Sequence, residues 1–213
     1  AACSGFVYAL TQADNMIRLG QVKTALVIGA ESLSKIVDWT DRNTCVLFGD
    51  GAGAVVLRAK EGEGAKTDTG ILATKIYADG SHYDHLKTNG GVSSTQNAGV
   101  VSMDGKEVFK YAIGSLSQAA ETVTAMAGYT NADIDWLIPH QANIRIISNV
   151  GEKLGLPEEK VIVAVDHHGN TSAASIPLAF SENMESGKIK KGDLVVFSAM
   201  GAGFTWGGAA IRL

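Results

Sequence analysis

Residues 194–213 read LVVFSAMGAGFTWGGAAIRL, two short apolar segments joined by a glycine-rich turn. Apolar segments of this length, bounded by turn residues, are typical of buried β-strands. A similar pair occurs earlier in the chain, as LVIGAE (26–31) and GAVVLR (53–58). Each pair follows a predicted helix, the first headed by Cys3 and the second by Ser172. This repeated order predicts two related halves.

Strand-like and helix-like patterns alternate along the rest of the chain, which predicts an α/β layered fold. Apolar residues at helical spacing predict helices over 4–19, 107–127, 143–154 and 172–186. Short apolar runs predict strands over 24–29, 44–48, 54–58, 71–77, 134–138, 161–165, 194–198 and 209–212. The polar, glycine-bearing stretch 79–99 is expected to form a long loop.

The repeat also suggests how the chain is divided. We expect residues 65–213 to form a complete half and residues 1–64 to form the C-terminal part of the other half. The first half is then incomplete in this sequence, because no earlier strands precede its helix. The 213 residues are enough for one sizeable domain or two small halves packed together.

Composition excludes several classes of protein. Charged residues make up 19% of the chain, below the typical quarter, so part of the surface is expected to lie against partner protein. A net charge of −4 argues against nucleic-acid binding. Two cysteines cannot build a disulfide-rich scaffold and suit a reducing cytoplasm. No apolar run approaches the roughly 20 residues of a membrane-spanning helix.

Cys3 is the first residue that suggests chemistry. A thiol at a helix N-terminus faces unpaired N–H groups and the positive end of the helix dipole, both of which favour the thiolate. The alternative is a buried structural cysteine, the default for a single thiol. Cys45, inside the predicted strand 44–48, is expected to be structural.

His140 and Asn170 are two further candidates. His140 follows a predicted strand in IPHQAN (138–143), and Asn170 lies in HGNTS (168–172), at a similar junction. Loops at the carboxyl ends of strands are where α/β proteins carry working residues. The alternatives are a satisfied core histidine and a helix cap. Together with Cys3 the set suits acyl chemistry on sulfur.

Two other patterns could form a binding site, one for an oxyanion and one for a metal ion. The turn at 201–208 consists mainly of small residues, so its backbone N–H groups can hold an oxyanion, although a tight hairpin also explains it. His82 and His85 lie near Asp79 and Asp84 in the predicted loop, but no third ligand stands at a recognised spacing. We therefore expect no metal in the reaction.

Several motifs in a fixed order resemble one family, β-ketoacyl-[acyl carrier protein] synthase III, which initiates bacterial type II fatty acid synthesis. They are AACSGFVYAL (1–10), DRNTCVLFGDGAGAVVL (41–57), DGKEVFKYAI (104–113), IPHQANIRII (138–147), HGNTSAASIP (168–177) and GAGFTWGGAAIRL (201–213). The resemblance covers the whole chain. It implies a thiolase-like αβαβα fold of two duplicated halves, and a homodimer in the cytoplasm.

The resemblance also implies roles for residues. Cys3 would be the acylated nucleophile, with His140 and Asn170 completing the triad and the backbone N–H groups of Cys3 and Ala202 forming the oxyanion hole. Phe48 would lie near the acyl pocket. The coenzyme A tunnel would be lined by Arg42, Phe109, Asn143 and Arg145. The carrier protein would contact Lys110 and Arg145. The substrates would be a short acyl-CoA and malonyl-[acyl carrier protein], and no cofactor is implied.

The sequence departs from the family in two ways. The part that normally precedes the Cys motif is not in this sequence. We therefore expect either that this part is present as a separate chain or that the enzyme is incomplete. Ala202 also stands within the usual glycine-rich turn. The alternatives are a starter condensing enzyme of polyketide or quinolone type, a hydroxymethylglutaryl-CoA synthase, a Cys-His-Asn thioester hydrolase, or an inactive fragment.

Overall fold

The computed structural model describes all residues from 1 to 213. Five α-helices are present: α1 Gly5–Arg18, α2 Gly105–Met126, α3 Ile144–Lys153, α4 Val165–His168 and α5 Ser175–Glu185. Eight strands are present: β1 Thr24–Glu31, β2 Gly51–Arg58, β3 Gly70–Ala78, β4 Leu86–Thr88, β5 Val101–Met103, β6 Trp136–Pro139, β7 Leu194–Gly201 and β8 Thr205–Arg212. None of the helices is both long and apolar enough to cross a membrane.

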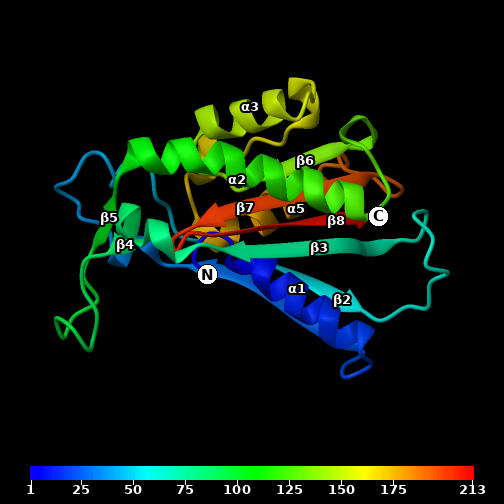
Figure 1. Ribbon diagram of the computed structural model, residues 1–213, viewed down its shortest axis with the longest axis horizontal. Coiled ribbons are helices and arrows are strands. Elements are labelled where there is room, and N and C mark those ends of the chain that lie inside the picture. Colours follow the sequence, from blue (N-terminus) through cyan, green and yellow to red (C-terminus); the bar gives the residue numbers. More distant parts are fainter.

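A four-stranded mixed sheet in the order β3-β8-β7-β6 forms the centre of the molecule. The central strand β7 is buried along its whole length, which explains its continuous apolar sequence. It pairs in parallel with β6 and in antiparallel fashion with β8. Figure 1 shows α2 and α3 on one side of this sheet and α1 on the other.

The helices on the two faces of the central sheet create two apolar cores. One core of 18 buried residues fills the space between the central sheet and the α2–α3 layer. The other, of 17 buried residues, joins the opposite face of the sheet to α1 and α5. Beyond α1 and α5 lies the antiparallel pair β1-β2, so the layers run helix, sheet, helix, sheet.

The repeated order expected from the sequence is present in the elements. Helix α1 leads into the antiparallel pair β1-β2, and helix α5 leads into the antiparallel pair β7-β8. Helix α5 accommodates Pro177 in its first turn, because N–H groups there have no hydrogen-bond partner within the helix. The division of the chain at residues 64 and 65 stays a prediction.

Two predicted strands are wrong. Residues 162–164 form no strand, because the Gln141 side chain accepts hydrogen bonds from the N–H groups of Ala164 and Val165, and α4 begins there. Only Val161 makes an isolated bridge, to Leu137.

Residues 44–47 form turns instead of a strand, and only Phe48 makes a bridge. The carboxylate of Asp41 accepts hydrogen bonds from the Asn43 N–H and the Thr44 hydroxyl, and this local bonding competes with a strand ladder. The long loop expected over 79–99 is also shorter, since a helical turn over Gly80–His85 and strand β4 occupy its first part.

Two glycines test the layered packing in opposite directions. A Cβ on Gly29 of β1 would lie 2.2 Å from the Ala173 carbonyl oxygen, whereas a Cβ on Gly114 of α2 meets nothing within 4 Å. We expect Gly29→Ala to lower the free energy of unfolding by about 1–3 kcal/mol. Gly114→Ala should raise it by about 0.5–1 kcal/mol. Urea denaturation followed by circular dichroism measures both, and equal stabilities of the two variants would contradict the packing.

Candidate active site

A cavity of about 860 Å³ lies at the carboxyl ends of strands β6 and β7. Cys3, His140 and Asn170, which are far apart in the sequence, all line this cavity. All three side chains are buried. The structure therefore brings together the three residues that the sequence singled out.

Backbone contacts hold the three residues in place. The His140 N–H donates to the Ser198 carbonyl at 2.7 Å, which continues the pairing of β6 with β7 by one residue. The Asn170 N–H donates to the Leu47 carbonyl at 2.8 Å, beside the bridge between Asn170 and Phe48.

Cys3 is placed by the close approach of its backbone to Gly201, which ends β7. A Cβ built on Gly201 would lie 2.6 Å from the Cys3 nitrogen, so a larger residue at 201 would displace Cys3. The neighbouring Ser4 hydroxyl lies 2.7 Å from the Thr205 hydroxyl of β8 and fastens the same junction. The start of α1 is thus fixed against the β7–β8 turn.

Burial controls the thiol of Cys3. It raises the pKa of Cys3 to about 11, although a hydrogen bond with the Ser172 side chain lowers it; the charge of Glu31 adds a smaller increase. The expectation of a resting thiolate is therefore wrong, because loss of water around the sulfur outweighs the favourable contacts. Burial therefore favours the neutral thiol form of Cys3.

His140 is likewise held neutral. Burial lowers the pKa of its imidazole to about 4, because the cavity wall removes the water that would stabilise the cation. The Ser175 hydroxyl oxygen lies 2.7 Å from His140 Nδ1 and 3.2 Å from the Gln141 nitrogen. The Ser175 oxygen accepts the Gln141 N–H and keeps a second lone pair, so the 2.7 Å contact fits either tautomer of the ring. We assign the Ser175 hydroxyl as donor to Nδ1, which places the proton of the ring on Nε2.

Asn170 has its amide orientation set by its own chain. The Asn170 Oδ1 accepts the Ser172 N–H at 2.9 Å, so its NH₂ group remains available as a donor. Ser172 itself has φ of 50°, the left-handed region that non-glycine residues seldom adopt. His140 and Asn170 therefore offer two neutral N–H donors to the same cavity.

Most of the predicted substrate-binding residues line the cavity. Phe48, Phe109, Asn143 and Arg145 do so, and the Arg145 guanidinium lies over the Phe109 ring at 4.9 Å. The Asn143 side chain also caps α3 by accepting the Ile146 N–H.

Three predicted residues lie outside the cavity lining. Arg42 does not line it, although its neighbours Asp41 and Asn43 do. Lys110 is exposed and lies 3.5 Å from Glu107. Ala202 follows the lining residue Gly201 without lining the cavity itself.

Apart from Phe109, the sequence did not predict the wall that α2 contributes to the cavity. Val108, Ala112 and Leu116 recur at four-residue spacing and present one face of α2 to the cavity. This spacing is visible in the sequence, but it does not distinguish a cavity wall from an ordinary core face. Lys106, also in the lining, joins Arg145 as a second cation, and such a pair suits the phosphates of a nucleotide-like substrate.

The role of Ser175 can be tested on the imidazole of His140. At pH 7 and at pH 5 we expect ¹⁵N chemical shifts of a neutral ring with the proton on Nε2, because burial excludes the cation and Ser175 occupies Nδ1. Ser175→Ala should raise the share of the Nδ1–H form, whereas Ser175→Thr, which keeps the hydroxyl, should not. A wild-type ring protonated on Nδ1 would contradict this hydrogen-bond assignment.

Comparison with known protein families identifies two matches. Residues 1–80 match the model described as 3-Oxoacyl-[acyl-carrier-protein (ACP)] synthase III. Residues 124–213 match the corresponding C-terminal model. Together these segments contain Cys3, His140 and Asn170.

Relatives of the chain agree with these matches. It is 58% identical over 213 residues to a beta-ketoacyl-[acyl-carrier-protein] synthase III of Paramagnetospirillum magneticum, covering all of this chain and 66% of the relative. The chain thus spans about two thirds of the length of this relative.

Solved structures are also similar. A 3-oxoacyl-[acyl-carrier-protein] synthase III from Aquifex aeolicus superposes with a TM-score of 0.92 at 49% identity, covering all of this chain and 65% of the other. The priming beta-ketosynthase of the R1128 polyketide pathway superposes with a TM-score of 0.88 at 34% identity, covering all of this chain and 64% of the other. This likeness confirms the thiolase-like α/β fold.

Proposed function

The chain belongs to the 3-oxoacyl-[acyl-carrier-protein] synthase III family, and on this premise we propose that it carries the acyl-transfer and condensation chemistry of such a synthase. The reaction joins a short acyl-CoA to malonyl-[acyl carrier protein] and gives a 3-oxoacyl-carrier protein, the first condensation of fatty acid synthesis. One observation supports this most strongly: a buried thiol shares a cavity with two neutral N–H donors.

In the first half-reaction the Cys3 sulfur attacks the thioester carbonyl of the acyl-CoA. A bond forms between sulfur and the carbonyl carbon, the carbon–sulfur bond to CoA breaks, and the thiol proton ends on the CoA sulfur. The raised pKa of Cys3 means that the proton leaves only as the bond forms. We assign the oxyanion to the backbone N–H groups of Cys3 and Ala202, whose loss would raise the barrier by about 3–4 kcal/mol.

In the second half-reaction malonyl-carrier protein occupies the cavity. His140 Nε2–H and the Asn170 NH₂ group donate hydrogen bonds to its thioester carbonyl. The bond to the carboxylate breaks, CO₂ departs, and the electron pair becomes an enolate that these donors stabilise. The enolate carbon attacks acyl-Cys3, and the Cys3 thiolate that leaves takes up a proton. The desolvated, neutral imidazole of His140 can serve as such a donor through Nε2–H.

Substrate binding is assigned to the cavity mouth. We place the acyl chain near Phe48 and the coenzyme A along Arg42, Phe109, Asn143 and Arg145. The acidic carrier protein is assigned to Lys110 and Arg145, since Lys110 is exposed and both are cations. No cofactor takes part in this mechanism.

The assembly and cellular location are part of the same proposal. We propose a homodimer that includes the family's N-terminal portion, either in the same chain or as a separate one. We place the protein in the cytoplasm, where Cys3 and Cys45, both free thiols, would stay reduced.

A second candidate function is priming of polyketide synthesis. The likeness to a priming beta-ketosynthase at 34% identity favours it over the remaining alternatives. The two functions differ in the primer and in the carrier protein that accepts the product. A Cys-His-Asn hydrolase is less well supported, because it needs a basic imidazole, and His140 has a pKa of about 4.

Three alanine variants separate the two half-reactions. We expect Cys3→Ala to abolish transfer of an acyl group from acyl-CoA to the protein, because no other thiol lines the cavity. His140→Ala and Asn170→Ala should keep acyl transfer and slow decarboxylation of malonyl-carrier protein by 100-fold or more, about 3 kcal/mol or more in barrier. Release of ¹⁴CO₂ and acylation of the protein are the two measurements.

Cys45→Ala serves as the matched control, since Cys45 lies outside the cavity lining. It should leave both half-reactions unchanged. Undiminished decarboxylation by Asn170→Ala would contradict the pair of donors.

A further inference from the structure

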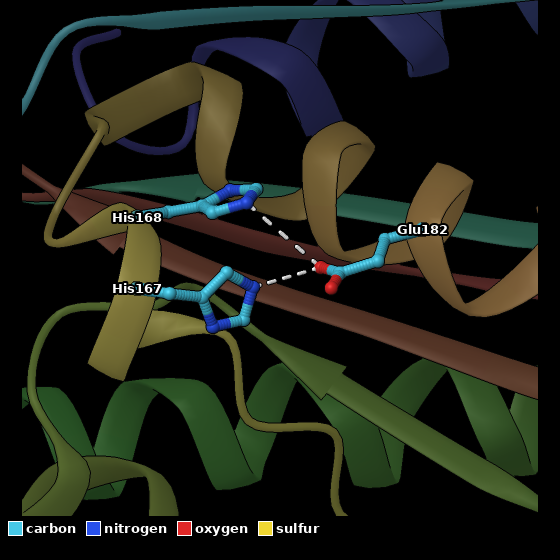
Figure 2. A group of neighbouring side chains, drawn as sticks. All are labelled: His167, His168 and Glu182. Carbon is cyan, nitrogen blue, oxygen red and sulfur yellow. Dashed lines mark hydrogen bonds and ion pairs between the residues drawn. The ribbon is translucent and has the colours of Figure 1, made fainter. Parts of the chain in front are cut away.

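A second group of polar side chains lies outside the cavity, between α4 and α5. His167 and His168 end α4, and Glu182 lies on α5 (Figure 2). The Glu182 Oε2 is 3.0 Å from His167 Nε2 and 3.9 Å from His168 Nε2. Taken together, one ligand atom from each residue lies within 4.8 Å of the other two. Figure 2 shows both rings turned toward the carboxylate.

The orientation of His167 is set by a further carboxylate. The Asp166 Oδ1 lies 2.9 Å from His167 Nδ1, on the side of the ring away from Glu182. When Nδ1 donates its proton to Asp166, the lone pair of Nε2 points at the space shared with Glu182 and His168. Histidines that bind metals are commonly held in this way by a carboxylate on the second nitrogen.

We propose that His167, His168 and Glu182 bind a divalent transition-metal ion, with Zn²⁺ as the best match. Two imidazole nitrogens and one carboxylate oxygen form a recognised zinc ligand set, and water can complete the tetrahedron at this solvent-facing position. Ligands about 2.0–2.2 Å from zinc lie roughly 3.3–3.6 Å from one another. The observed separations of 3.0 and 3.9 Å fall on either side of this range, and all three ligand atoms lie within 4.8 Å of one another, so side-chain rotations are needed to close the site.

The charge and chemistry of the group also favour a divalent transition-metal ion. Asp166 and Glu182 supply two negative charges next to the imidazoles, and no Lys or Arg is paired with either carboxylate. Imidazole ligands select zinc, copper, nickel and iron over magnesium and calcium, which prefer sets made only of oxygen. A hard cation is therefore disfavoured.

The metal would act on the segment that carries Asn170, without entering the reaction. None of the three ligands lines the cavity. His167 and His168 lie just before residues 169–174 and Glu182 lies after them, so the ion ties together the two helices that flank this segment. The segment contains Asn170 and Ser172, whose mutual hydrogen bond orients the Asn170 amide. Metal binding would therefore stiffen this part of the cavity wall.

The test is titration of the tag-free chain with Zn²⁺ followed by isothermal calorimetry. We expect one ion per chain, and an affinity at least tenfold weaker in His167→Gln, His168→Gln and Glu182→Gln. Asp166→Asn should weaken binding by about tenfold through the orientation of His167. Glu185→Gln removes the same charge from the same helix outside the group, and it should bind as the wild type does. Glu182→Gln keeps the size of the side chain, which guards against loss of folding.

Hydrogen exchange gives a second readout that does not depend on activity. Zn²⁺ should slow amide exchange in residues 169–174 of the wild type and leave the His168→Gln variant unchanged. Absence of zinc binding by the wild type, or unchanged affinity in the His168→Gln and Glu182→Gln variants, would overturn the site. Zinc binding without slower exchange in residues 169–174 would overturn the proposal that the ion stiffens this segment.

Discussion

The 2.7 Å hydrogen bond between the buried side chains of Ser175 and His140 decides what this cavity can do. Burial favours the uncharged imidazole, and the bond that we assign from Ser175 to Nδ1 places the proton of the ring on Nε2. A charged or differently protonated ring would change the hydrogen-bonding character of the cavity wall. The Gln141 N–H also donates to the Ser175 oxygen, which holds this hydroxyl beside the ring.

Such a site requires backbone segments to approach more closely than a Cβ atom would allow, and glycines make this possible. Gly201 lets β7 end against Cys3, and Gly29 lets β1 lie against Ala173, next to the segment that carries Asn170. The layered packing thus brings these contacts next to Cys3 and next to the segment that carries Asn170. The fold therefore does more than provide a scaffold, since the same packing that removes water also sets the protonation of Cys3 and His140.

Part of this could be predicted from the sequence alone. The α/β layering and the helices followed directly from periodicity, and the meeting of Cys3, His140 and Asn170 followed from their places at the ends of elements. The strand expected over 161–165 was wrong because Gln141, from another segment, takes the N–H groups that a ladder would need. Nothing in the sequence near 161–165 reveals that competition.

Electrostatic properties were the least predictable from sequence. The position of Cys3 before a helix suggested a thiolate, but the pKa depends on how completely the folded chain removes water from the sulfur. Ser175 could not be distinguished from the other serines in SAAS (172–175), because its partner Nδ1 lies 35 residues away in the sequence. The family resemblance implied that Arg42 lines the coenzyme A tunnel, but only its neighbours Asp41 and Asn43 line the cavity, because side-chain direction in a turn has no simple periodicity.

The most direct test of the mechanism is the first covalent step. The protein is incubated with labelled acetyl-CoA, and intact mass and peptide mapping then locate the label. We predict a single acetyl group on Cys3 and none in Cys3→Ala. Acetyl on another residue, or release of CoA without any acylated protein, would contradict the proposed acyl-thioester intermediate.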